Sequence, residues 1–402
     1  MRLALIADVF PPQCSSGAVQ IRDLALEFAR QGHRVAVMVP SPELTKNWEI
    51  ESWNGVEVVR LRALPTTGLG YVRRTIGELL MPFLIWYQLR RSPLRDARWD
   101  GVVWYSPTIF HAPLVHWLKS SSRCKGYLII RDIFPEWAVD MGIMGRGLPY
   151  LFFKVVASYQ YFVADVIGIQ SPGNRIYFKE WTRNSTRRVE VLQNWLADGV
   201  VTDCSIRLSE TKLAGRKVFV YAGNMGVAQG MGILLDLAER LRVRSDIGFL
   251  FVGRGSEAKN LAQDARARGL DHVLFHDEIH PDEIPGLYAQ CQVGLIALDP
   301  RHRSHNIPGK FLTYMQSGLP VLATINPGND LAGMIRQECV GKVSEQGSVD
   351  VLERLAVELL DSLCVDPGIT ARCRALYVRQ FTPDAAVSQI VLAFGAVGDA
   401  SK

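Results

Sequence analysis

The sequence predicts an α/β protein made of two Rossmann-like domains in tandem. A chain of 402 residues is too long for one ordinary core, so two domains of about 200 residues are expected. Short apolar runs alternate with helical patterns along the whole chain, and the alternation starts again after a stretch of weak periodicity at 194–216. Near-continuous apolar runs are typical of parallel strands that helices cover on both faces.

The first series of elements opens with a strand at 3–7 and a helix whose apolar face carries Ile21, Leu24, Ala25 and Phe28. Gly32 closes that helix, as glycine commonly does. Further strands of this half are predicted at 35–39, 56–60, 102–105, 127–130, 166–169 and 189–192.

The second series has the same alternation. Its strands are predicted at 218–221, 249–252, 273–275, 293–296 and 320–323, with helices at 231–243, 256–269 and 309–317. A last amphipathic helix is expected at 383–397. We therefore predict an N-terminal domain over 1–200, a C-terminal domain over 201–380, and a helix and tail over 381–402.

Composition narrows the class of protein. With 48% hydrophobic and 21% charged residues, the chain is globular rather than disordered. Its seven cysteines are scattered singly, without metal-ligand or disulfide spacing, which fits a reducing compartment. No uncharged apolar run reaches the roughly 20 residues that a membrane-spanning helix needs. A cytoplasmic protein without a metal or other cofactor is the expectation.

Positive charge is concentrated in one segment. Residues 60–98 hold eight arginines against Glu78 and Asp96, a local charge of +6, whereas the whole chain carries +5. Within it, residues 79–89 (LLMPFLIWYQL) lie between two arginine pairs, as in a helix that rests on an anionic membrane surface. A core helix with solvated ends is the alternative, and no motif for reading bases favours nucleic acid.

Candidate ligand sites lie in the strand-to-helix turns, where parallel sheets bind ligands. The first turn, 8–19, has Ser15, Ser16 and Gly17 just before a helix. In the second half, YAGNMGVAQGMG at 221–232 and FVGRGSE at 251–257 each follow a strand and precede a helix. Two glycine-rich loops on neighbouring strands favour a phosphate-bearing ligand.

A third loop, 299–323, is dense in His and Arg and runs into a helix that begins near Pro308. Lys310 and the N–H groups of residues 309–311 would converge there on one anion, with Arg301 and Arg303 in reach. Such cations would stabilise a leaving diphosphate. Lys310 and Arg303 are therefore candidate catalytic groups.

These loops carry a resemblance to glycosyltransferase family 4, in particular to WbuB-like O-antigen transferases. The motifs are RDIFPEW at 131–137, QNWLAD at 193–198, GNMGVAQG at 223–230, VGRGSE at 252–257 and IPGKFLTYMQSGLPV at 307–321. The resemblance implies the GT-B fold, with a cleft between the domains and a C-terminal helix that returns to the N-terminal domain. It also implies metal-free transfer with retention of configuration, from a nucleotide-diphospho-sugar on the C-terminal domain to an acceptor on the N-terminal domain.

The resemblance assigns site residues by matching positions. Family members usually carry two acids eight residues apart in the third loop, where this chain has His305 and Thr313, and an Arg and a Lys where it has Asn224 and Gln229. The expected donor-binding set is Gly17, Gly223, Asn224, Gln229, Gly253, Arg254, Gly255, His305, Pro308, Gly309 and Thr313.

The acceptor side is expected in the turn after the strand at 127–130. Many family members have a His-Asp pair there, and this chain has Arg131 and Asp132. Asp132 or Glu136 could accept the acceptor's hydroxyl proton, with a turn or helix-start residue as the alternative interpretation of each. Ser16, Arg131 and His111 are the acceptor-binding candidates.

The sequence-based hypothesis is a transferase that moves an N-acetylated or deoxy sugar from a UDP-linked donor to a polyprenyl-diphosphate-linked saccharide. It would act at the inner face of the membrane, held there by residues 60–98. A nucleotide-sugar 2-epimerase of the same architecture and a catalytically weakened donor-binding scaffold remain alternatives. The epimerase needs several acids in the cleft, and these loops are poor in acids.

Overall fold

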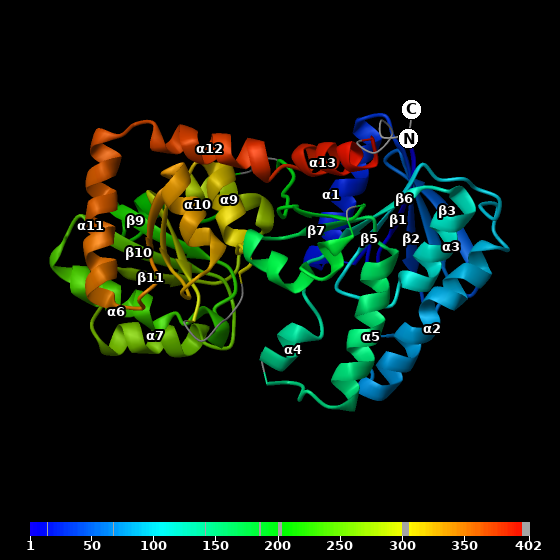
Figure 1. The fold of residues 1–402 in the computed structure, drawn as a ribbon. Coiled ribbons are helices and arrows are strands. Elements are labelled where there is room, and N and C mark those ends of the chain that lie inside the picture. Colours follow the sequence, from blue (N-terminus) through cyan, green and yellow to red (C-terminus); the bar gives the residue numbers. More distant parts are fainter. Residues whose placement is uncertain are drawn as a thin grey trace. The chain divides into compact units, whose positions relative to one another are not determined.

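A computed structural model describes residues 1–13, 15–66, 68–140, 142–184, 186–199, 203–299 and 305–395. The chain forms two compact units (Figure 1). The first comprises Met1–Trp195 together with the chain from Pro383, and the second comprises Leu196–Thr382.

The first unit is built on a mostly parallel sheet. Among its described residues the strand order is β3-β4-β2-β1-β5-β6-β7-β8. The strands are β1 (Arg2–Ile6), β2 (Arg34–Pro40), β3 (Trp48–Trp53), β4 (Val56–Leu61), β5 (Gly101–Tyr105), β6 (Lys125–Ile129), β7 (Val166–Ile169) and β8 (Arg188–Val191). The helices are α1 (Ser16–Arg30), α2 (Tyr71–Leu89), α3 (Ala112–Ser122), α4 (Glu136–Asp140), α5 (Leu148–Val163) and α13 (Pro383–Gly395), with 3-10 turns at Pro172–Phe178 and Trp181–Arg183.

Alternate residues of β1 pack into two different cores. Ala4 and Ile6 join the cluster beneath α2 and α3, whereas Leu3 and Leu5 join the one beneath α1 and α13. Both faces of the sheet are therefore covered, which is why its strands read as continuous apolar runs. The predicted apolar face of α1 is buried as expected.

The C-terminal helix α13 belongs to the first unit, as the sequence analysis expects. Figure 1 shows it beside α1, and Arg30 bonds Asp384 across the two helices at 3.0 Å. Phe394 lies in the same core cluster as Leu3 and Leu5. The chain thus leaves the first unit and returns to it.

The second unit holds a parallel sheet whose described strands run in the order β11-β10-β9-β12-β13-β14. They are β9 (Lys217–Ala222), β10 (Ile247–Val252), β11 (Val273–His276), β12 (Val293–Ala297), β13 (Val321–Thr324) and β14 (Gly341–Ser344). The helices are α6 (Gly232–Arg240), α7 (Ala258–Ala267), α8 (Ile284–Tyr288), α9 (Gly309–Ser317), α10 (Asp330–Glu338), α11 (Val349–Val365) and α12 (Ile369–Gln380), with 3-10 turns at Leu208–Glu210, Val227–Gln229, Leu241–Val243 and Pro281–Glu283.

Two strands were absent from the sequence-based prediction, and both lie at the edge of a sheet. β3 (WEIESW) pairs antiparallel with β4, and its half-buried residues, Trp48, Ile50 and Trp53, are separated by exposed ones. β14 (GKVS) is a four-residue edge strand of the second sheet. Edge strands bury less apolar surface than central ones, so neither produces the continuous apolar run that marks the others.

The arginine-rich segment contains a helix with two apolar faces. Met81, Ile85 and Leu89 of α2 lie in the core, as the core-helix interpretation expects. Phe83 and Tyr87, on the other side, are exposed. No helix among the described residues is long and apolar enough to cross a bilayer.

Candidate donor and acceptor sites

Among the described residues of the second unit, Lys310 is a cation that reaches the first glycine-rich loop. It stands in the first turn of α9, which begins after Pro308 and ends at Gly318, whose φ of 72° lies in the left-handed region. Phe311 and Tyr314 of this helix are fully buried and fix its orientation. Burial lowers the pKa of the Lys310 ammonium to about 8, and no carboxylate of the described residues offsets this.

The side chain of Lys310 crosses the first glycine-rich loop. Its Nζ lies 4.6 Å from the ring centre of Tyr221, at the end of β9. A methyl group on Gly223 would lie 2.8 Å from Cε and 3.0 Å from Nζ of Lys310. Gly223 therefore leaves the space that the lysine occupies, and the ammonium is held at the carboxyl end of the sheet.

Gly253 and Gly255 bring two backbones together. A methyl group on Gly253 would lie 2.2 Å from the carbonyl oxygen of Gly223, and one on Gly255 would lie 2.3 Å from that of Met225. Backbone bonds join the two loops, from Gly223 N to Val252 O and from Met225 N to Arg254 O. These glycines are needed for packing between the loops, before any ligand approaches.

The start of α9 offers fewer free N–H groups than expected. Phe311 N donates to Pro308 O at 3.0 Å, so this N–H is already used. The N–H groups of Gly309 and Lys310 remain at the positive end of the helix dipole. Arg303 and Arg301 lie outside the described residues.

Several predicted donor-side side chains are engaged within the second unit. Gln229 Oε1 accepts from Gly226 N at 2.9 Å and so closes its own loop, while Asn224 is exposed. The Arg254 guanidinium pairs with Glu278. His305 Nδ1 bonds the carbonyl of Gly328, and Thr313 Oγ1 donates to the carbonyl of Lys310. The described side chains thus leave Lys310 as the main cation for a diphosphate.

Arg131, predicted to contact the acceptor, is a core residue of the first unit. It is 5% exposed, donates from Nη1 to Leu192 O at 3.1 Å, and stacks over Trp195 and Tyr105. Burial lowers the pKa of its guanidinium. This corrects the expectation of direct contact: Arg131 anchors the turn from inside, because its long planar group fits between two aromatic rings.

Asp132 and Glu136, the two candidate bases, lie in different surroundings. The Asp132 residue is exposed, yet neighbouring protein atoms partly desolvate its carboxyl and so raise its pKa. The positive charge of Arg131 opposes this increase. Glu136, in the first turn of α4, forms an ion pair with Lys154 of α5, and its Oε2 is buried. A raised pKa and an open carboxylate suit proton acceptance, so Asp132 is the better candidate.

His111, another acceptor candidate, is fully buried. Its Nε2 lies 3.0 Å from Oδ1 of Asp8, which follows β1 and is partly exposed. The expectation that the His111 ring contacts the acceptor is therefore corrected, because the ring is buried. Only the Asp8 carboxylate of this pair is partly exposed. Asp8 was missed because a single acid after a strand is a weak signal by itself.

The loop after β1 places the remaining two candidates at the start of α1. Ser15 caps the helix, accepting from Ala18 N, so Ser16 and Gly17 stand in its first turn rather than before it. Ser16 is exposed, and Gly17 packs near Val9 and Tyr105.

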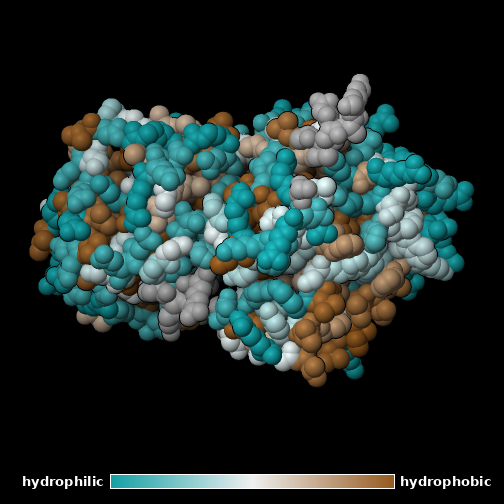
Figure 2. Space-filling model, in the orientation of Figure 1, coloured by the Kyte–Doolittle hydropathy of each residue, from teal (hydrophilic) through white to brown (hydrophobic). Residues whose placement is uncertain are grey.

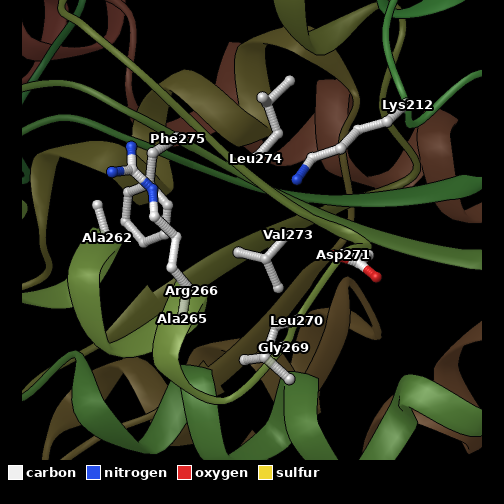
Figure 3. A pocket seen from close by; sticks show the side chains of 10 residues that line it. All are labelled: Lys212, Ala262, Ala265, Arg266, Gly269, Leu270, Asp271, Val273, Leu274 and Phe275. Carbon is white, nitrogen blue, oxygen red and sulfur yellow. The ribbon is translucent and has the colours of Figure 1, made fainter.

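A cavity of the second unit lies away from the glycine-rich loops. It has a volume of about 250 Å³ and lies between α7 and the beginning of β11 (Figure 3). Lys310 and Gly223 are not among its lining residues. Its lining residues are Lys212, Ala262, Ala265, Arg266, Gly269, Leu270, Asp271, Val273, Leu274 and Phe275. It contributes nothing to the site around Lys310.

Part of the second unit matches a known family model. Residues 216–362 match the family model "Glycosyl transferases group 1", which covers the loops around Gly223 and Lys310. The chain is 23% identical over 254 residues to the probable glycosyltransferase WbjE of Pseudomonas aeruginosa, an alignment that spans 61% of this chain and 62% of WbjE. It is also 23% identical to the putative colanic acid biosynthesis glycosyl transferase WcaI of Escherichia coli, over 79% of this chain and 82% of WcaI.

The fold has solved counterparts. Anabaena HepE in complex with UDP superposes with a TM-score of 0.67 at 14% identity, covering 99% of this chain and 100% of HepE. HepE is also solved with UDP-glucose. At this identity the likeness concerns the fold, which is GT-B. The matched domain, the two bacterial relatives and the fold together support a GT-B glycosyltransferase.

Proposed function

We propose that this protein is a retaining, metal-independent glycosyltransferase of bacterial surface-glycan assembly. It would transfer an N-acetylated or deoxy sugar from a UDP-linked donor to a lipid-linked saccharide. The observation that carries the proposal is the Lys310 ammonium, held over Tyr221 and against Gly223 at the start of α9.

The donor's diphosphate would bind at Lys310 and the N–H groups that open α9. Transfer breaks the bond between the sugar's anomeric carbon and the diphosphate, and negative charge grows on the departing oxygen. A lysine ammonium and a helix N-terminus stabilise that charge without a metal. The UDP and UDP-glucose complexes of HepE support a nucleotide-sugar donor.

The acceptor hydroxyl would lose its proton to Asp132 while its oxygen bonds to the anomeric carbon on the face that the diphosphate leaves. Asp132 is open to solvent and has a raised pKa. Arg131, fixed between Trp195 and Tyr105, would hold the Asp132 turn in position.

The glycan class and the location are proposed on separate grounds. One relative is named for colanic acid biosynthesis, which supports a glycan-building role. The exposed apolar side of α2, within the arginine-rich segment 60–98, supports peripheral attachment to the inner face of the membrane, where a polyprenyl-diphosphate-linked acceptor would lie.

Incubation of the purified protein with labelled nucleotide sugars, with and without a lipid-diphosphate saccharide, tests the function. Transfer to the lipid, or slow release of free sugar, is the expected result. A product that is an isomerised nucleotide sugar would establish the epimerase instead, and binding without turnover would establish a scaffold.

Nucleotide affinity should depend on pH through Lys310. The ammonium is present below its pKa of about 8 and is lost as pH rises through that value. The UDP dissociation constant should therefore change little between pH 7 and 7.5 and rise by up to about tenfold per pH unit above 8. Calorimetric titrations with UDP across this pH range measure the dissociation constant. In Lys310→Arg the rise of the dissociation constant at alkaline pH should be smaller.

Substitution of the two candidate bases should have unequal effects. Asp132→Asn should lower kcat by about 100-fold or more, because the exposed base is removed. Glu136→Gln should lower it less, because Lys154 already holds that carboxylate. UDP affinity, measured in parallel, should be unchanged in both. The reverse order of effects would assign the proton to Glu136.

A further inference from the structure

The first unit carries an exposed apolar surface built from two helices. Among the described residues, thirteen of the twenty-five exposed large apolar side chains lie on α2 and α5. On α2 they are Tyr71, Val72, Ile76, Leu79, Leu80, Phe83 and Tyr87; on α5 they are Leu148, Leu151, Phe152, Val155, Tyr159 and Phe162. Figure 2 shows an apolar area where these helices run in Figure 1.

This set of residues, here named the α2/α5 face, forms a stripe on each helix. The spacings of three and four residues place its members on the outward side. The inward side of α5 buries Ala157, Gln160 and Val163. A helix whose outward side is apolar as well is normally covered, so the exposed half of α5 implies a partner.

α3 joins the two helices into one surface. Trp86 of α2 packs edge-to-face on Trp117 of α3, and His116 of α3 bonds the Tyr159 hydroxyl of α5 at 2.9 Å. Both helices therefore rest on the same support within the first unit. This arrangement makes Trp86 part of the inner packing, whereas Phe83 and Tyr87 are free to contact a partner.

The charges around the α2/α5 face are mostly positive. Arg73 and Arg146 are exposed, and Arg90 and Arg91 lie over the rings of Trp86 and Tyr87. Glu78 is the single acid on the two helices, and it pairs with Arg74. A second copy of the chain would bring the same arginines together, whereas an anionic bilayer offers both hydrocarbon and negative charge.

We propose that the α2/α5 face docks the protein on an anionic membrane surface, with α5 inserting alongside α2. This deepens the proposed function and rests on its peripheral-membrane part, which concerned residues 60–98 alone. Tyr71, Tyr87 and Tyr159 suit the headgroup level, where an aromatic ring with a hydroxyl is half hydrated.

The same surface adjoins the turn of the candidate base. Lys154 of α5 forms an ion pair with Glu136, four residues after Asp132. Docking through α5 therefore sets the Asp132 turn close to the headgroups, where the diphosphate and first sugars of a lipid-linked acceptor lie.

Co-sedimentation with vesicles of equal parts phosphatidylglycerol and phosphatidylcholine tests the docking. Leu151→Gln/Val155→Gln should lower the partition coefficient at least tenfold, since two aliphatic side chains that would enter the bilayer on docking are lost. Val243→Gln/Leu392→Gln, which changes two exposed aliphatic residues outside this face, is the matched control and should bind like the unaltered protein. Arg73→Gln/Arg146→Gln should weaken binding to these vesicles several-fold but not to pure phosphatidylcholine.

Other outcomes would overturn the proposal. Unchanged sedimentation of the α5 variant with an unchanged melting temperature would exclude α5 as a docking helix. A dimer in analytical ultracentrifugation that the same variant dissociates would assign the face to a second copy. UDP affinity and sugar transfer, measured on each variant, separate the docking proposal from the enzymatic one. Vesicle binding without any sugar transfer would leave docking intact and refute the transferase.

Discussion

Lys310→Met should abolish sugar transfer and weaken UDP binding by at least 100-fold. The ammonium is the main described cation at the start of α9, and removal of a partner from a charged diphosphate typically costs a few kcal/mol. Met keeps the length and volume of the chain over Tyr221, so the packing against Gly223 is preserved. Isothermal titration with UDP and a radiolabelled transfer assay measure both effects.

The same change should stabilise the protein in the absence of nucleotide. Burial lowers the folded-state pKa of Lys310 to about 8 from 10.5, so at neutral pH the charged form destabilises the fold. The free energy of unfolding of Lys310→Met should therefore rise by about 3 kcal/mol at pH 7, and the difference should vanish as pH approaches 10.5. Lys310→Arg keeps the charge and should keep part of the UDP binding. Full transfer activity in Lys310→Met would remove the lysine from the mechanism.

Gly253→Ala should lower the free energy of unfolding of the second unit by about 3 kcal/mol or more and abolish UDP binding. Its Cβ would lie 2.2 Å from the carbonyl oxygen of Gly223, a backbone atom that cannot turn away, and φ at this position is 138°. The two loops must separate to accept the methyl group, and Gly223 would move away from Lys310. Urea unfolding and UDP titration measure the two effects.

Gly333→Ala is the matched control for this prediction. Gly333 lies inside α10, has no atom near its Cβ position and has no positive φ. Alanine there should raise stability by about 0.5–1 kcal/mol, because glycine is a poor helix former. Equal stability of Gly253→Ala and Gly333→Ala would contradict the tight packing of the two loops.

The sequence by itself determined the two α/β halves and the position of α9. Buried parallel strands need apolar residues on both faces. The sequence therefore shows continuous apolar runs at β1, β5, β10 and β12. A proline before a helix and a glycine after it mark the ends of α9, which begins and ends where predicted. These signals are local in the chain, so no tertiary information was needed for them.

Tertiary structure decided which polar groups remain available. Arg131 and His111 stand in strand-to-helix turns and look accessible in the sequence, yet both are buried against residues distant along the chain, Trp195 and Asp8. Gly253 looks like a ligand-approach glycine, but its space is taken by the neighbouring loop. Burial and pairing depend on contacts between distant segments, which residue type and spacing do not specify.

The exposed side of α5 shows the same limit. The sequence of α5 is mostly apolar, with Lys154 as its single charged residue, which is equally typical of a buried helix. Only the packing of one side on α3 and on the sheet leaves Leu151, Val155 and Phe162 facing outward. The sequence thus determined the fold and the cation of α9, while the tertiary structure decided which surfaces and charges that fold leaves open for a partner.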